Sequence, residues 1–305
     1  MTKPKNTEYH VPVMLKECLD ALQIKPDGIY LDLTFGGGGH SQAILSKLTT
    51  GKLLAFDQDP DAKANAIALD DKRLEFVHSN FRYFNKYLRM YNVQKVDGIL
   101  ADLGVSSHQI DAPERGFSTR FDADLDMRMD KKGKLTAAMI LNEYPEEQLV
   151  QMFSHYAEIR NARTLARTIH IVRDNEPINT TKQLKEIILP LANRGKENQY
   201  LARVYQALRI EVNDEMAALR DMLAQTADVL APGGRLVVMS YHSLEDRLVK
   251  YYINTGNFTG EAMKDFYGNL LRPLSPVVRK PITASSEEVE INKRARSAKL
   301  RIAEK

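Results

Sequence analysis

The feature that most constrains this chain is the alternation of short apolar strands with amphipathic helices over its first third. Four apolar runs are separated by helix-type patterns, at residues 29–33, 53–56, 74–78 and 96–101. Repeated strand–helix crossovers require a parallel sheet, with helices covering both of its faces. The pattern therefore predicts an α/β fold with a Rossmann-like, doubly wound sheet.

A second pattern interrupts the first. From residue 136 to about residue 200 the spacing of apolar residues is helical, and a strand pattern resumes only at residues 235–239. A helical block set between strand units is typical of an inserted subdomain. We therefore expect residues 1–110 and 211–305 to form one domain and residues 111–210 a mostly helical insertion. The stretch after Arg272, rich in proline and charge, should be mostly extended or loop.

A run of four glycines, Gly36 to Gly39, follows the first strand, and Asp57 ends the second. Glycines there let a ligand approach the backbone, and an acid there can bind ribose hydroxyls. A dinucleotide-binding loop needs a third glycine where this chain has Ser41, and no Lys-Ser or Lys-Thr pair makes a phosphate loop. This favours S-adenosylmethionine, which has no phosphate, over NAD. A simple turn, with Asp57 capping a helix, remains the alternative.

Asp102 ends the fourth strand, in the sequence Asp-Leu-Gly-Val-Ser-Ser. Amino-methylating enzymes place an acid or amide at this corner, where it accepts a hydrogen bond from the amine that is methylated. Their usual motif continues with two prolines and an aromatic residue, whereas this chain continues with Leu103, Gly104 and Val105. Asp102 is therefore our catalytic candidate, with the acceptor left open and a helix-capping role as the alternative.

Six sequence blocks together resemble the MraW/RsmH family. They lie in order along the chain, at residues 30–41, 102–107, 114–118, 125–130, 240–247 and 294–301. The enzymes of this family use S-adenosylmethionine to methylate N4 of a cytosine in 16S ribosomal RNA. The later blocks, such as Ser-Tyr-His-Ser-Leu-Glu-Asp-Arg at 240–247, are more specific than the glycine loop.

The resemblance implies a class I methyltransferase fold, with a helical insertion that helps to bind substrate. It implies methylation of a cytosine in the decoding region of 16S RNA, within the small ribosomal subunit. The cofactor-binding residues it implies are Gly38, Gly39, His40, Asp57, Phe81, Asp102 and Gln109. Gly37 and His108 depart from residues that the family often has at those positions.

Candidates for RNA contact come from three places. Ser106 and Ser107 follow Asp102, and Tyr241 and His242 follow the strand at 235–239. Tyr241 could stack on a flipped base, with a core position as the alternative, and His242 is better explained as structural than as a base. The third group is the basic set Lys293, Arg294, Arg296, Lys299 and Arg301, in a C-terminal stretch with nine basic and four acidic residues.

Other classes of protein are disfavoured. Cys18 is the single cysteine, and the seven histidines are scattered, so we expect no metal site. The aspartates at 122, 124, 126 and 130 lack the spacing of a calcium loop and are better explained by salt bridges. No signal peptide or membrane span is evident, and we expect a cytoplasmic protein, with a homodimer left open.

The alternatives are methylation of another amine, namely adenine N6 or DNA cytosine N4; an NAD-linked oxidoreductase; and a noncatalytic RNA-binding protein that retains a methyltransferase shell. The basic C-terminal stretch fits any partner that is a polyanion, and it fits a solvated tail equally well.

Overall fold

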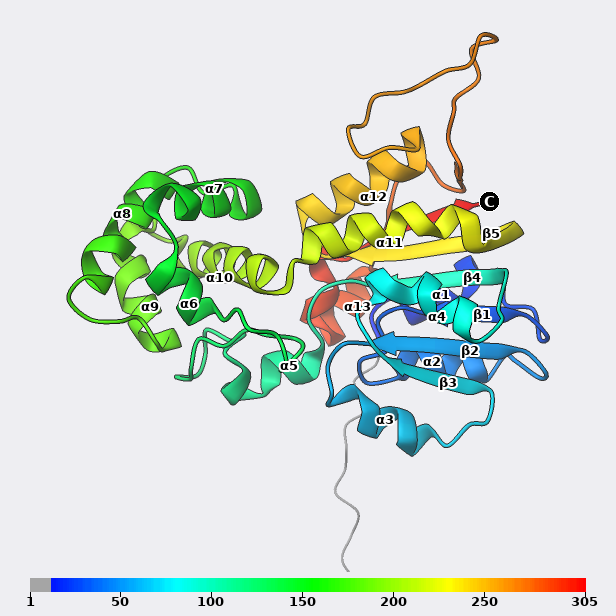
Figure 1. Ribbon diagram of the computed structural model, residues 1–305, viewed down its shortest axis with the longest axis horizontal. Coiled ribbons are helices and arrows are strands. Elements are labelled where there is room, and N and C mark those ends of the chain that lie inside the picture. Colours follow the sequence, from blue (N-terminus) through cyan, green and yellow to red (C-terminus); the bar gives the residue numbers. More distant parts are fainter. Residues whose placement is uncertain (1–11) are drawn as a thin grey trace, which may run out of the picture. The chain divides into compact units, whose positions relative to one another are not determined.

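The computed structural model describes residues 12–305 (Figure 1). Within them the chain forms two compact units. The first, here called the sheet unit, contains the residues up to Gly104 and those from Ala218 to Lys305. The second, the helical unit, is Val105–Ala217 and so begins and ends slightly outside the limits of 111 and 210 expected from the sequence.

The sheet unit is built on an eight-stranded sheet with the order β3-β2-β1-β4-β5-β8-β6, in which β7 also pairs with β8. Its strands are β1 (Ile29–Asp32), β2 (Lys52–Asp57), β3 (Leu74–His78), β4 (Val96–Asp102), β5 (Leu230–Ser240), β6 (Ser275–Pro276), β7 (Ile282–Thr283) and β8 (Lys299–Glu304). Strands β1 to β5 are parallel, and β6 to β8 are antiparallel to their neighbours. The expected doubly wound sheet is confirmed.

The order of the strands fixes where a ligand can bind. The chain proceeds from β1 outward to β2 and β3, and then crosses to the other side of β1 to form β4. In open α/β sheets, ligands bind at such a reversal, outside the carboxyl ends of the strands. In this sheet those ends are Asp32, Asp57 and Asp102, the last residues of β1, β2 and β4.

Helices and buried side chains cover the sheet. The helices are α1 (Leu15–Leu22), α2 (Gly39–Leu45), α3 (Ala62–Leu69), α4 (Phe84–Met90), α11 (Glu215–Val229, in this unit from Ala218), α12 (Ser243–Thr255) and α13 (Ser286–Ile291), with short 3-10 turns η1 (Phe81–Tyr83) and η4 (Lys293–Ser297). Leu22 of α1 and Ile44 of α2 join Leu53, Leu100 and Val237 of the strands in one buried cluster.

The C-terminal stretch from Arg272 is mostly extended or loop, as expected, and its helical parts are limited to α13 and the 3-10 turn η4. The strand β8 follows η4. Leu300 and Ile302 alternate with charged residues, and their side chains are buried in the sheet core. Alternation of apolar and charged residues is the mark of a strand with one buried face, which the high charge of the segment concealed.

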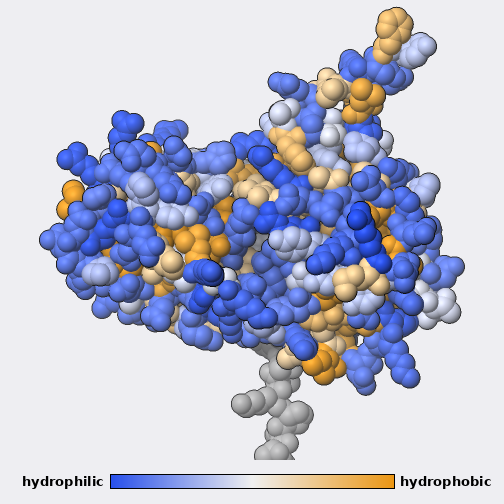
Figure 2. Space-filling view, in the orientation of Figure 1, coloured by the Kyte–Doolittle hydropathy of each residue, from blue (hydrophilic) through white to orange (hydrophobic). Residues whose placement is uncertain are grey.

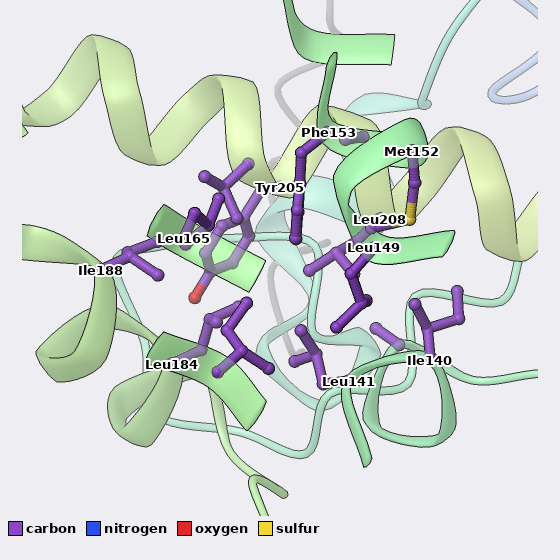
Figure 3. Packing of buried hydrophobic residues seen from close by; sticks show 14 of the residues in the cluster. Ile140, Leu141, Leu149, Met152, Phe153, Leu165, Leu184, Ile188, Tyr205 and Leu208 are labelled. Carbon is purple, nitrogen blue, oxygen red and sulfur yellow. The ribbon is translucent and has the colours of Figure 1, made fainter. Parts of the chain in front are cut away.

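The helical unit has its own core (Figure 3). Its helices are α5 (Ser107–Asp111), α6 (Ala137–Glu143), α7 (Glu146–Ala157), α8 (Ala162–Arg173), α9 (Thr181–Ile188) and α10 (Glu197–Asn213), with 3-10 turns η2 (Pro113–Arg115) and η3 (Leu189–Leu191). Leu149 and Phe153 of α7 pack in one cluster with Leu165 and Leu208. Asp126, one of the four clustered aspartates, forms an ion pair of 2.7 Å with Arg128. Among residues 12–305, no helix is both long enough and apolar enough to cross a bilayer.

Candidate functional site

The glycine loop between β1 and α2 is shaped by its backbone. Gly36 and Gly38 have φ angles of 51° and 81°, in the left-handed region that favours glycine. A Cβ on Gly38 would lie 2.8 Å from the ring of Phe35, and one on Gly39 would lie 2.4 Å from Pro12. A Cβ on Gly37 would meet nothing within 4 Å, so the loop is open at this residue.

Asp57 holds this loop from the neighbouring strand. Its carboxylate accepts hydrogen bonds from the backbone N–H of Gly36, at 2.7 Å, and of Asp59, at 2.8 Å. Burial raises the pKa of Asp57 to about 6, although these two hydrogen bonds act in the opposite direction. Each carboxylate oxygen still has a free lone pair, which is what a ribose hydroxyl requires.

Asp32 is a buried acid that our sequence analysis did not select as a site residue. It accepts a hydrogen bond of 2.6 Å from the hydroxyl of Ser41 and one of 3.1 Å from the N–H of Thr34. Burial raises its pKa, with the Ser41 hydrogen bond as the main opposing effect. The signal that could have revealed it is its place at the end of a strand, like Asp57 and Asp102.

Asp102 accepts one side-chain hydrogen bond and has one basic side chain beside it. The hydroxyl of Tyr241 donates a 2.8 Å hydrogen bond to Oδ1, and Nδ1 of His40 lies 3.9 Å from Oδ2. Burial raises the pKa of Asp102 to about 6, and His40 and the Tyr241 hydroxyl offset this only in part. The backbone N–H of Asp102 donates to the Thr34 hydroxyl at 2.7 Å, which ties β4 to the end of β1.

The hydrogen bonds of His40 suggest which of its nitrogens carries a proton. Nε2 lies 3.2 Å from the carbonyl oxygen of Val13, which can only accept, so this nitrogen is assigned as the N–H. Nδ1 then lies on the side of the ring that faces Asp102, 3.9 Å from Oδ2 and beyond hydrogen-bond distance.

Glu245 of α12 fixes the turn that carries Tyr241 and His242. Its carboxylate accepts hydrogen bonds from the backbone N–H of Tyr241, at 2.8 Å, and of His242, at 3.3 Å. Nδ1 of His242 accepts from the N–H of Glu245 at 3.4 Å, which completes a helix-capping box. This favours the structural interpretation of His242, and it adds Glu245, 3% exposed, to the residues that shape the site.

Other predicted cofactor residues are dispersed. Gly38 caps α2, where Gly39 and His40 form the first turn, and Phe81 begins η1 as a half-buried residue. Gln109 belongs to the helical unit, where its side chain and that of Ser106 cap α5 reciprocally. Ser107 is the first residue of that helix. The structure brings together Asp57, the glycine loop, His40 and Asp102, whereas Gln109 is described only within the helical unit.

The basic candidates divide into two groups. Lys299 and Arg301 both pair with Asp246 of α12, at 3.1 Å and 2.6 Å, so their charges are used within the sheet unit. Lys293 and Arg296 in η4 are exposed, and Arg294 is half-buried. All five remain candidates for RNA contact, and Lys299, with 43% of its side chain exposed, is more accessible than Arg301, with 11% exposed.

The residues at this sheet edge fit S-adenosylmethionine. In residues 12–305, no lysine or arginine forms an ion pair with Asp32, Asp57 or Asp102, and His40 is the one basic neighbour of Asp102. Buried carboxylates without a fixed counter-charge suit a ligand that carries a sulfonium and an ammonium group. Asp57 would hold the ribose, and the open side of the loop at Gly37 leaves space for the ligand.

A model of the MraW methylase family matches residues 7–305. The chain belongs to the MraW methylase family. The recognition made from sequence motifs is thereby confirmed, together with the class I methyltransferase fold and the S-adenosylmethionine cofactor that it implied.

Two relatives of this MraW methylase that are more than 50% identical to it agree with the family match. A protein named ribosomal RNA small subunit methyltransferase H from Christiangramia forsetii is 56% identical over 299 residues, covering 98% of each chain. One of the same name from Bacteroides fragilis is 54% identical, covering 99% of each chain. A solved rRNA methylase from Streptococcus thermophilus aligns with 95% of this chain and 93% of its own, at 12% identity and a TM-score of 0.41.

Proposed function

We propose that this chain transfers the methyl group of S-adenosylmethionine to N4 of a cytosine in the decoding region of 16S ribosomal RNA, within the small subunit and in the cytoplasm. Family membership over nearly the whole chain supports the reaction class, and the relatives' names support the RNA. The observation that carries the chemistry is Asp102, a carboxylate at the switch point of the sheet. It accepts a hydrogen bond from Tyr241, lies 3.9 Å from His40, and pairs with no lysine or arginine in the described part of the chain.

Asp102 would act on the amine that is methylated. S-adenosylmethionine supplies a methyl group on a sulfonium, which is already activated for transfer. The lone pair of a cytosine amine is delocalised into its ring, and a carboxylate that accepts one amine N–H makes the nitrogen more nucleophilic. The ionised form of Asp102 is needed for this, and Tyr241 keeps its oxygen Oδ1 in a fixed place. Alignment and electrostatics then supply most of the rate.

Asp102 can also remove the proton that the amine must lose. Asp102, with a pKa of about 6, can take that proton at neutral pH. Release of the proton therefore needs no additional base at this corner of the site.

The test is mass spectrometry of 16S RNA from cells that lack this chain. One N4-methylcytosine should disappear, and the wild-type chain should restore it.

Asp102→Ala should lower the single-turnover rate on unmodified small subunits by about a hundredfold or more. Asp57→Ala should weaken binding of S-adenosylhomocysteine by about tenfold. Asp20→Ala, at an exposed pair with Lys16, is the matched control.

The remaining alternatives give different results in the same assay. An enzyme that methylates adenine N6 or DNA cytosine N4 would transfer labelled methyl to naked DNA or yield methyladenine. A noncatalytic RNA-binding shell would bind small subunits without transfer. Family membership sets aside the NAD-linked oxidoreductase. Sedimentation equilibrium of the same preparation tests the homodimer.

A further inference from the structure

A projecting arm, residues 257–272, leaves the end of α12 and returns to β6 (Figure 1). It is a hairpin in which Lys264 bridges to Leu270 and the N–H of Leu271 donates to the carbonyl of Met263 at 2.8 Å. The chain reverses through Asp265, Phe266, Tyr267 and Gly268. The arm contains none of the residues described above for the candidate functional site.

Two aromatic rings stand at the tip of the arm with almost no protein contact. Phe266 is 97% exposed and Tyr267 is 86% exposed, and their rings pack edge to face with centroids 5.7 Å apart. Seven of the fourteen exposed large hydrophobic residues in the described chain lie between Met263 and Val278. Figure 2 shows apolar side chains along this arm, against a largely polar surface. Apolar groups concentrated in this way mark an interaction site.

The arm is held in shape before it meets a partner. The carboxylate of Asp265 accepts hydrogen bonds from the N–H of Tyr267, at 2.9 Å, and from the backbone and side chain of Asn269, at 2.8 and 2.9 Å. At the root, Phe258 stacks on Tyr252 at 5.4 Å. A turn held in this way loses little backbone conformational entropy on binding.

The charges near the arm favour a polyanion as the partner. Residues 257–281 contain four basic residues, Lys264, Arg272, Arg279 and Lys280, and two acidic ones, Glu261 and Asp265. Arg279 and Lys280 are exposed, whereas Asp265 directs its oxygens into the turn. A second copy of this chain, docked on a twofold axis, would bring these cations together.

We propose that the arm is an RNA-binding element in which Phe266 and Tyr267 stack on unpaired bases of ribosomal RNA while the nearby cations contact phosphates. The proposal rests on the proposed function for the identity of the RNA. Aromatic side chains bind unpaired bases by stacking, and each stacked base contributes appreciably to affinity whichever of the four bases it is. The arm therefore adds affinity outside the site where methyl transfer takes place.

The test separates stacking from simple apolar contact. The variant Phe266→Leu with Tyr267→Leu keeps apolar bulk and loses the flat rings, whereas Phe266→Tyr with Tyr267→Phe keeps both rings. Filter binding to an unmodified 16S RNA transcript and to unmodified small subunits should weaken about tenfold or more for the leucine pair and stay near wild type for the aromatic pair. Ile67→Ala, 69% exposed on α3, is the control. Affinity for S-adenosylhomocysteine should be the same in all four proteins.

Three outcomes would overturn the proposal. They are wild-type RNA binding by the leucine pair, loss of binding to subunits with no loss on naked RNA, and a change in sedimentation that shows the rings join two copies of the chain. The proposed function fails separately. If the proposed function fails, the wild-type chain binds RNA through the arm but transfers no methyl group to it. If the wild-type enzyme methylates normally and the leucine pair binds RNA as well as wild type, only the proposed role of the arm is refuted.

Discussion

At the scale of single residues, the carboxyl ends of β1, β2 and β4 carry acids that have few charged partners. Asp57 and Asp102 each have a pKa raised to about 6 by burial, and both use backbone or tyrosine hydrogen bonds in place of an ion pair with lysine or arginine. Such groups make the free protein less stable at neutral pH, because the folded state disfavours their charged forms. A positively charged ligand removes that cost when it binds.

Tyr241 gives this electrostatic arrangement a direct test. Its hydroxyl donates to the charged form of Asp102 and so lowers the pKa that burial raises. Methyl transfer should increase as pH rises through about 6, where Asp102 ionises. Tyr241→Phe should move this acidic limb to higher pH by about one unit, because the charged form has lost a donor. Single-turnover rates between about pH 5 and 9 measure the shift.

The control for this prediction is Tyr91→Phe, which removes an exposed hydroxyl that donates to Glu75 at 2.8 Å and takes no part in the hydrogen bonds of Asp102. It should leave the profile where it is. If Tyr241→Phe lowered the rate equally at every pH, the hydroxyl would serve substrate binding, and its effect on the pKa of Asp102 would be unimportant.

At the scale of elements, the pairing of β8 with α12 shows what a charged sequence can conceal. Asp246 of α12 holds Lys299 and Arg301 of β8. Burial tends to raise the pKa of Asp246, but the hydrogen bonds from Arg301 and Lys299 outweigh it, so the pKa is lowered. The stabilisation is present above the ordinary pKa of a carboxyl group, near 3.9, and is lost as pH falls through the lower pKa of the folded state.

Asp246→Asn should therefore destabilise the protein. It leaves the guanidinium of Arg301, 11% exposed, without its counter-charge, at a cost of about 2–3 kcal/mol in the free energy of unfolding at pH 7. Urea unfolding followed by circular dichroism measures this, and the difference from wild type should shrink as the solution is made more acidic. Asp20→Asn, at an exposed pair, should leave the free energy of unfolding close to that of wild type. An equal effect of the two changes would refute the role given to Asp246.

The parallel strands, the helical insertion and the glycine loop were predictable because each depends on local patterns of apolar residues and glycines. The contact between Asp102 and Tyr241 was not, since it joins residues 139 positions apart whose strands are neighbours only in the folded sheet. Asp32 and Glu245 were missed for a related reason, because a buried acid differs from a surface acid only through the partners that the fold supplies. The ion pairs of Lys299 and Arg301 likewise depend on Asp246, which is distant from them in the sequence.

At the scale of the whole molecule, the excess of basic over acidic residues is concentrated in the stretch from Arg272 onward. The net formal charge is +3, while the stretch from Arg272 onward has nine basic and four acidic residues. The exposed cations of this stretch include Arg279 and Lys280, which precede β7, and Lys293 and Arg296 of η4. An enzyme of this kind should bind RNA through a limited number of phosphate contacts, with moderate dependence on salt.

The two units, each with its own buried core, predict two unfolding transitions in scanning calorimetry. S-adenosylhomocysteine should raise the melting temperature of the sheet unit selectively, because ligand that binds the folded state stabilises it by mass action. Phe153→Ala removes a fully buried ring from the helical unit and should cost about 3–5 kcal/mol, lowering the other transition. Phe84→Ala, equally buried in the sheet unit, should do the reverse. A single transition that both variants lower together would mean that the units unfold as one, and cofactor binding would then stabilise the helical unit as well.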